Sequence, residues 1–468
     1  MSSAIVWILL PFVVGLLLVS LVRYRNLIYG IAIVVTGLLA ILAAVVTISQ
    51  PFSLGFTSIK IEPALIILGR SLVLDRFDQT ILVILFSFTT FWLIGGRFAR
   101  ITNLLPPAAL LITSLLIATF AVEPFLYAAL FIEGVVLVSI PMLSQAFTEP
   151  HPGVVRYLVF QTIGMPFLLL TGWLLSGIET APSDPSDVIQ IIIFLGVGFA
   201  FILAVFPLYS WIPMLAEEED TYLTGFLFLM LQTGVMFFLL TFIDHYTWLR
   251  NSVDLPKILQ YAGVLMIITG GVWSGFQRNL ARMFGFAVIL ENGFAILSLG
   301  LMTMRGYEIF ANLLLARMVA FGLWSMSLSL AKKAFGSLQM DQTRGLARLY
   351  PLLAISILAA QFSIGGLPIF AGFPLRIALI EELSLQSTTL AWLTIIGIAG
   401  VWAGGIYSLF IFLLKPENPI EMRLPNKVLP VLLGIGVAVL IFLGLFPQLV
   451  SPMMVDLLKA YPRLLALP

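Results

Sequence analysis

The 468-residue sequence contains no cysteine and only two histidines, and charged residues make up just 10% of it. Without cysteine the chain forms no disulfide, no thiolate metal site, no iron–sulfur cluster and no cysteine nucleophile. It also lacks a glycine-rich nucleotide-binding loop, so we expect no cofactor and no redox centre on this chain. The net charge of +1 gives no indication of nucleic-acid binding.

Apolar residues dominate what is present. They make up 60% of the sequence, and the mean hydropathy is +1.10, which excludes an ordinary water-soluble domain and predicts an all-α polytopic membrane protein. The first apolar run lacks the features of a signal peptide, so we expect a retained helix there. Segments long enough to cross a bilayer predict about fourteen helices, near 4–22, 28–49, 78–96, 104–121, 124–144, 156–176, 187–214, 222–243, 259–275, 281–302, 308–330, 350–383, 389–414 and 428–448.

One pattern occurs twice. Phe206-Pro207-Leu208-Tyr209-Ser210-Trp211-Ile212-Pro213 and Leu367-Pro368-Ile369-Phe370-Ala371-Gly372-Phe373-Pro374 share both prolines at an offset of 161 residues (368 − 207 and 374 − 213). Proline removes a backbone donor and clashes with the preceding turn, so each copy predicts a broken membrane helix. Paired breaks in two halves point to an ion or substrate path near the membrane midplane.

The two predicted breaks lie five helices apart, so the halves that contain them should run in opposite directions. We therefore expect a single membrane domain over 1–468 with inverted five-helix repeats. Its parts would be three helices near 1–100, one repeat near 101–245, a second near 256–415, and a terminal helix near 425–450. The loop from Gln50 to Leu74 carries few charges and predicts no inserted soluble domain.

The distribution of arginine and lysine predicts the orientation. Fourteen basic residues fall in loops after odd-numbered helices and eight on the other face, which places both termini on the non-cytoplasmic side. The acidic run from Glu217 to Asp220 would then be cytoplasmic. Such runs are usually solvated turns, and we expect the same here.

The functional argument depends on four ionisable residues inside predicted spans: Glu133, Glu291, Arg317 and Arg376. Glu133 and Glu291 are 158 residues apart, close to the offset of the prolines, and are predicted repeat mates near the midplane. Charge at such depth costs at least about 2.5 kcal/mol, so each group needs a partner or water. We expect Glu291 to pair with Arg317 on the next helix, an arrangement that could equally be a structural ion pair. Small residues such as Gly400 and Gly404 predict close helix packing.

These residues resemble a known family. The stretch from Phe206 to Pro213 is similar to the Phe-Pro-x-His-x-Trp-x-Pro signature of the antiporter-like membrane subunits of complex I, multi-subunit sodium/proton antiporters and membrane-bound hydrogenases. Gly366 to Arg376 resembles that family's Gly-x-Pro-x-x-x-Gly-Phe-x-x-Lys, and Glu133 its fifth-helix glutamate. Gln277 to Arg282, leading into Phe284-Gly285, resembles its approach to the tenth helix.

The resemblance implies a subunit that moves ions along a midplane chain of titratable residues, driven by redox chemistry in partner subunits. The sequence departs from the pattern where the family has lysines and a histidine. Ile202 and Gln232 stand at two lysine positions, Tyr209 stands at the histidine, and Arg317 and Arg376 stand at two further lysines. A guanidinium stays charged and does not pass a proton, so the usual relay is interrupted, although glutamine and tyrosine still order water.

Three hypotheses remain open. The first is a subunit of a complex I-like or hydrogenase-type complex that moves protons or sodium ions by a modified route through Glu133, Gln232, Tyr209, Glu291, Arg317 and Arg376. The second is a non-pumping structural or coupling subunit of the same complex. The third is an independent secondary transporter. The first two imply other membrane subunits as partners, and all three imply the lipid bilayer.

Overall fold

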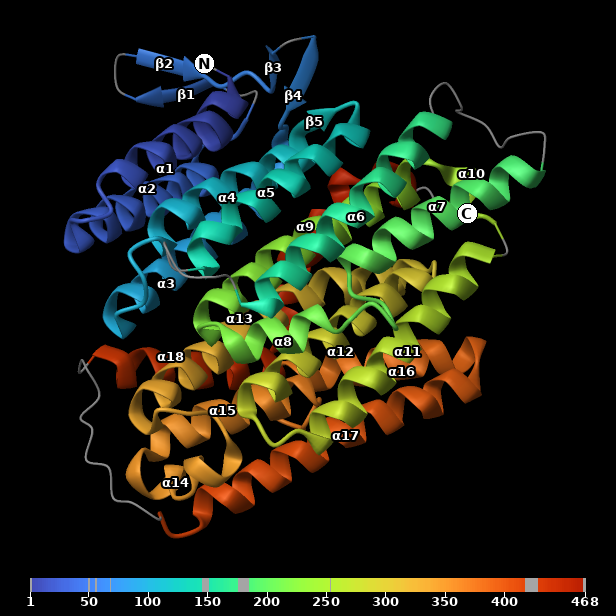
Figure 1. Cartoon of the computed structure of the whole chain (residues 1–468). Helices are drawn as coiled ribbons and strands as arrows, with labels where there is room; N and C mark the ends of the chain where they lie inside the picture. Colours follow the sequence, from blue (N-terminus) through green and yellow to red (C-terminus); the bar gives the residue numbers. More distant parts are fainter. Residues whose placement is uncertain are drawn as a thin grey trace.

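The computed structural model describes residues 2–48, 51–54, 57–67, 69–144, 151–175, 185–252, 254–416 and 428–465. Its helices lie side by side in one bundle (Figure 1). The first half contains η1 (Ile5–Leu9), α1 (Leu10–Ser20), α2 (Arg25–Val45), η2 (Arg76–Asp78), α3 (Gln79–Ala99), α4 (Leu105–Ala121), η3 (Phe125–Tyr127), α5 (Ala128–Leu143), α6 (Pro152–Leu174), α7 (Pro185–Ile202), α8 (Trp211–Glu218), α9 (Thr221–His245) and α10 (Thr247–Arg250).

The second half continues in the same manner. It contains α11 (Asp254–Phe276), α12 (Leu280–Gly300), α13 (Met304–Phe335), η4 (Met340–Thr343), α14 (Leu346–Leu349), α15 (Pro351–Ile364), α16 (Gly372–Gln386), α17 (Thr388–Leu413), α18 (Val428–Leu445), α19 (Pro447–Val455), η5 (Asp456–Ala460) and α20 (Pro462–Leu465). The short helices after α18 were not expected from the sequence.

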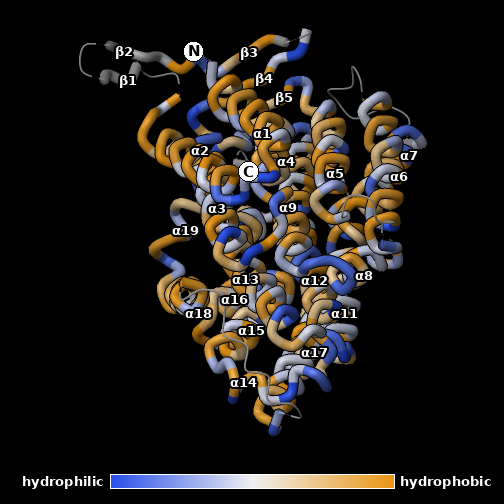
Figure 2. Tube along the Cα trace, turned by 60° about the vertical axis from the view of Figure 1, so that its left-hand side comes forward, coloured by the Kyte–Doolittle hydropathy of each residue, from blue (hydrophilic) through white to orange (hydrophobic). Residues whose placement is uncertain are grey.

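The helical membrane fold is confirmed, and every expected span coincides with a helix or a helix pair. Within the described ranges, ten helices are long and apolar enough to cross a membrane. Three shorter apolar helices cover Ile5–Ser20, Leu105–Ala121 and Ser186–Ile202. Figure 2 shows apolar residues along most of the helices, with a hydrophilic stretch beside α8. The number of crossings and the inverted repeats stay predictions.

Five short strands were not predicted. β1 (Pro51–Leu54) pairs antiparallel with β2 (Thr57–Lys60), and β3 (Ala64–Ile67), β4 (Arg70–Val73) and β5 (Val122–Glu123) form a second antiparallel sheet. β1 to β4 occupy most of the loop between α2 and α3, whereas β5 follows α4. The strands lie at the end of the bundle that carries the N-terminus (Figure 1). The loop therefore folds on itself.

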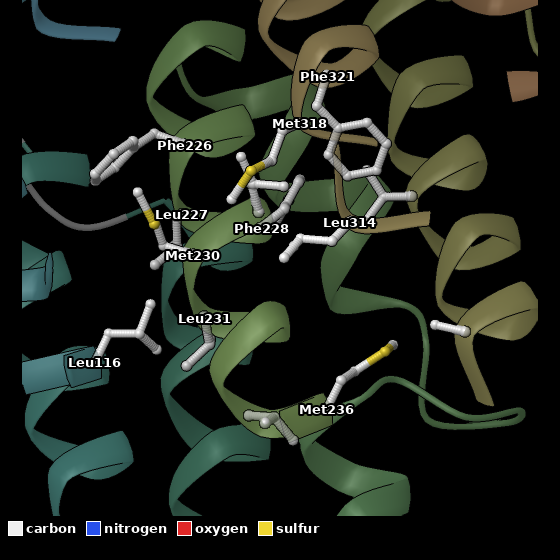
Figure 3. Packing of buried hydrophobic residues seen from close by; sticks show 14 of the residues in the cluster. Leu116, Phe226, Leu227, Phe228, Met230, Leu231, Met236, Leu314, Met318 and Phe321 are labelled. Carbon is white, nitrogen blue, oxygen red and sulfur yellow. The ribbon is translucent and has the colours of Figure 1, made fainter. Parts of the chain in front are cut away.

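Helices α9, α12 and α13 form the centre of the bundle, since they are the most deeply buried of the candidate spans. Figure 3 shows how apolar side chains of α9 meet those of α4 and α13. The labelled residues are Leu116 from α4, Phe226, Leu227, Phe228, Met230, Leu231 and Met236 from α9, and Leu314, Met318 and Phe321 from α13. Polar side chains in the middle of these three helices are thus remote from bulk water.

The backbones of α11 and α17 touch at glycines. A Cβ atom on Gly271 would overlap the carbonyl oxygen of Gly397, and one on Gly275 would lie 2.7 Å from the carbonyl oxygen of Gly400. The predicted close packing at Gly400 is confirmed. Such a crossing replaces side-chain packing by direct contact between helices, as small residues permit in membranes.

We expect Gly271→Ala to destabilise the chain by about 1–3 kcal/mol, because the added methyl group forces the two helices apart. The melting temperature of the detergent-solubilised protein measures this loss of stability. Gly30→Ala is the matched control, since a Cβ on Gly30 meets nothing within 4 Å. Equal melting temperatures for the two variants would contradict the expected role of this crossing.

Candidate functional site

The first break separates α7 from α8. Ala204 has a left-handed backbone (φ 60°), and the N–H of Val205 bonds back to the carbonyl of Ala200 at 3.0 Å. This geometry ends a helix and leaves carbonyl groups without helical partners. Side chains of α6 and α12 supply the missing donors: Gln161 Nε2 donates to the Ile202 carbonyl at 3.3 Å, and Asn292 Nδ2 donates to the Leu203 carbonyl at 3.4 Å.

The second break, between α15 and α16, begins in the same way. Gly366 is left-handed (φ 66°), and the N–H of Leu367 bonds to the carbonyl of Phe362 at 2.9 Å. Here a charged donor replaces the amides. Arg376 Nε and Nη2 both lie 3.2 Å from the Ile364 carbonyl, and Trp402 Nε1 donates to the Gly365 carbonyl at 2.7 Å.

Both predicted helix breaks are thus present, at 203–210 with Pro207 and at 365–371 with Pro368. Pro213 and Pro374 were expected within the breaks but lie in the first turns of α8 and α16, where a missing N–H costs no helical hydrogen bond.

The carbonyls freed at the breaks accept hydrogen bonds from protein side chains, while the Phe206 and Ile369 side chains are 45% and 55% exposed on this chain. A carbonyl group without a hydrogen bond is unfavourable in lipid, so the carbonyls must be covered. An apolar side chain has no such group, so it can face lipid or another protein at no comparable cost in free energy.

A buried ion pair joins the second break to the centre of the bundle. Arg376 Nη2 on α16 donates to Glu291 Oε1 on α12, and both residues are almost fully buried. The Arg376 guanidinium carbon also lies 3.8 Å from the centroid of the Phe294 ring. One arginine therefore neutralises a carboxylate, caps a broken helix and stacks on an aromatic face.

Glu291 does form a buried ion pair, but the predicted partner, Arg317, is wrong. Arg317 on α13 donates from Nη2 to Thr233 Oγ1 on α9 at 2.8 Å, while Glu291 is held by Arg376. The second break directs Arg376 into the bundle, so its guanidinium rather than that of Arg317 contacts the Glu291 carboxylate. Arg317 and Glu291 still line the same small cavity, together with Thr233 and apolar side chains that include Phe237.

Several buried polar atoms on α9, α12, α13 and α16 have no hydrogen-bond partner among the described residues. They are both amide atoms of Gln232, Asn292 Oδ1, Arg317 Nε and Arg376 Nη1. Buried polar groups are normally paired, so these atoms form a polar environment that suits water. Thr233 and Asn292 were missed by the sequence analysis; a signal for Asn292 was its position next to Glu291 in the middle of a mostly apolar helix.

Glu133 and Tyr209 do not join this group. Glu133 on α5 is half-buried and accepts a hydrogen bond from Thr162 Oγ1 on α6 at 2.9 Å. Tyr209 lies in the first break, where its ring stacks on Phe206 at a centroid distance of 6.0 Å. The structure thus brings together Glu291, Arg317 and Arg376, places Gln232 beside Thr233, and leaves Glu133 at the edge of the bundle.

The acidic run at the end of α8 is not the solvated turn we expected, because all four carboxylates have partners on other elements. Glu217 pairs with Arg282 and accepts from Asn279, Glu218 accepts from the Gly153 N–H, Glu219 lies 2.6 Å from His151 Nδ1, and Asp220 accepts from Ser329. The run thereby links the helix after the first break to α6, α12 and α13. Negative charge at the N-terminus of α6 is favourable.

A family model described as "NADH:quinone oxidoreductase/Mrp antiporter, TM" matches residues 126–401, more than half of the chain. The chain belongs to this family. The match includes both breaks, the Glu291–Arg376 pair and Arg317.

Curated relatives agree with this assignment. The chain is 28% identical over 264 residues to NADH-quinone oxidoreductase subunit N of Thioalkalivibrio sulfidiphilus, and 29% identical over 273 residues to that of Moorella thermoacetica. These alignments cover 55% and 54% of this chain. The chain spans about half the length (54%) of each of these relatives.

Solved structures share the fold over the whole chain. A chain of the Mrp complex from a Dietzia species aligns with a TM-score of 0.82 at 15% identity, covering 98% of this chain and 97% of that one. A chain of Thermus thermophilus respiratory complex I aligns with a TM-score of 0.77 at 20% identity, covering 99% and 100%. The fold of these family members is therefore preserved here from end to end.

We expect Arg376→Gln in this family member to destabilise the fold by about 3–5 kcal/mol, because it leaves the Glu291 carboxylate buried without a counter-charge. The double variant Glu291→Gln/Arg376→Gln should regain part of that loss, since two neutral amides can bond to each other. Thermal melting of the solubilised protein checks both values. Strictly additive losses would contradict the coupling of the two residues.

Proposed function

We propose that the chain is an antiporter-like membrane subunit of a multi-subunit complex. In it the chain would take part in moving protons, or sodium ions, across the membrane, while partner subunits carry out electron transfer and hold the redox cofactors. The relatives named NADH-quinone oxidoreductase subunit N and the shared fold with chains of complex I and the Mrp complex support this proposal. We also propose the orientation with both termini on the non-cytoplasmic side.

The observation that carries the proposal is the group of three charges at the centre of the bundle. Glu291, Arg317 and Arg376 lie on three different helices and are each less than a tenth exposed. Intramembrane charge is costly and usually marks an ion pathway. Glu291 is the member that can take up and release a proton, because guanidinium groups remain protonated.

Protonation of Glu291 would cancel its attraction to Arg376. Arg376 also holds the Ile364 carbonyl at the second break, so a change in the ion pair would act on the backbone there. The unpaired atoms of Asn292, next to Glu291 in the chain, and of Arg317, in the same cavity, offer hydrogen bonds to water, which can carry protons to and from the carboxylate. The arginines then supply fixed positive charge, and water and Glu291 supply the mobile proton.

A second function has its own support. Ile202 and Gln232 remove two groups that could titrate, and arginines at two further positions cannot release protons. A subunit of this kind could transmit conformational or electrostatic change between neighbours without moving ions itself. Glu133 distinguishes the two functions, because its carboxylate lies apart from the arginines and accepts a hydrogen bond only from Thr162 among the described residues.

If the chain moves ions, Glu133→Gln should lower the proton-to-electron ratio of the reconstituted complex while leaving electron transfer and assembly largely intact. Glutamine keeps the shape and the hydrogen bond from Thr162 but cannot exchange a proton. The ratio is measured in proteoliposomes from the initial rates of acidification and substrate oxidation.

Glu381→Gln serves as the control, because the Glu381 side chain on α16 is 65% exposed and pairs with Arg305 at the surface. An unchanged ratio in the Glu133 variant would reject translocation through this residue and favour the coupling function. Loss of electron transfer in both variants would instead indicate a general effect on the complex.

A further inference from the structure

Two cavities lie one above the other along α9. The central one contains Thr233, Glu291 and Arg317. The second has a volume of about 130 Å³ and lies toward the C-terminal end of α9, where Asp78, Thr241, Asp244 and Tyr461 line it. Phe237 belongs to the lining of both cavities.

The sequence of α9 explains this arrangement. Thr233, Phe237, Thr241 and Asp244 are spaced by four, four and three residues, so they lie on one face of the helix. The face is polar at both ends and apolar at Phe237. From Thr233 to Thr241 the rise along the helix is about 12 Å.

The second cavity suits water. A water molecule occupies about 30 Å³, so the volume accommodates several of them beside two carboxylates and two hydroxyl groups. Burial raises the pKa of Tyr461 above its usual value, so its hydroxyl stays neutral and can donate. Asp244 Oδ1 accepts the Leu464 N–H at 2.8 Å, which ties the cavity to the last helix of the described chain.

An aromatic layer separates this cavity from the central one. The Phe237 ring contacts Phe120, Phe310 and Tyr461, with ring centroids 5.6, 5.4 and 6.3 Å away. Phe237 itself is only 2% exposed. A constriction lined by apolar rings excludes water, so it interrupts a continuous row of water molecules between the two cavities until a ring moves. Hydrophobic constrictions close some membrane pores in the same way.

We propose that Phe237 is the gate of a water path between the Glu291–Arg317 site and the cavity at Asp78 and Asp244. This cavity is the mouth through which protons or monovalent cations exchange with the face that carries the chain termini. The inference rests on the proposed function and adds to it the side on which the central site opens. Rotation of the Phe237 side chain would join two polar cavities along one face of α9.

The absence of cysteine allows a direct test in the full chain within its native membrane. Ala295→Cys places a thiol in the central cavity and Thr241→Cys places one in the outer cavity, and Ag⁺ serves as a cation-sized thiol probe. Added from the face of the termini, Ag⁺ should modify Thr241→Cys readily and Ala295→Cys slowly. In Phe237→Ala, modification of Ala295→Cys should accelerate about tenfold or more, because the aromatic barrier is gone.

Phe228→Ala is the matched control. It removes the same ring from α9, but Phe228 packs on Trp211 and Phe284 and lines neither cavity. It should leave the Ala295→Cys rate unchanged. The Lys459 side chain in η5 is 55% exposed, so Lys459→Cys serves as the positive control for Ag⁺ that reaches the protein from the face of the termini. If Phe237→Ala does not assemble, Phe237→Leu should give a smaller acceleration and Phe237→Trp a slower reaction.

The gate is rejected if Ala295→Cys reacts quickly while Phe237 is present, or if its rate is the same in every assembled Phe237 variant. These rates do not require ion pumping. Acceleration in Phe237→Ala without coupled ion transport by the wild type would therefore support the gate and reject the proposed function. If the wild type transports ions but the rate of Ala295→Cys modification is the same with and without the Phe237 ring, the gate is rejected and the proposed function stands.

Discussion

The apolar membrane interior offers no hydrogen bonds, and the rest of the structure depends on how the two broken helices meet that constraint. Each break frees carbonyl groups that water cannot reach from the lipid side. Gln161 and Asn292 satisfy those of the first break, and Arg376 and Trp402 those of the second. Polar side chains on α6, α12, α16 and α17 are thus required by the fold before they serve any transport function.

The two breaks use donors of different charge, and this difference sets the electrostatics of the centre. Amide donors leave the first break neutral, whereas Arg376 brings a full positive charge into the second and requires the Glu291 carboxylate nearby. A desolvated pair of this kind contributes little net stability but is costly to break. It holds the titratable group of the site in one place, and Arg317 adds a further positive charge across a small cavity.

The acidic run from Glu217 to Asp220 has a comparable role at the end of the bundle. Each carboxylate binds a different neighbour, so α8 is anchored to α6, α12 and α13 although the chain before it is irregular. The break itself is held on its other side, where Gln161 and Asn292 bond to the carbonyls of Ile202 and Leu203. Asn292 lies on α12, the helix that also carries Glu291.

Composition and proline spacing determined the membrane class and both helix breaks, because hydrophobic length and the missing proline N–H act locally and leave a direct trace in the sequence. Charge inside apolar spans indicated the three charged residues of the central cluster, but not Thr233 or Asn292. The motifs around Phe206 and Gly366 determined the family. The partners of the charges were decided only by the tertiary structure: Arg376 rather than Arg317 reaches Glu291, since the second break turns its chain into the bundle. The position of Glu133 at the edge, the partners of the acidic run and the cavities on either side of Phe237 likewise depend on how distant helices pack, which no local pattern records.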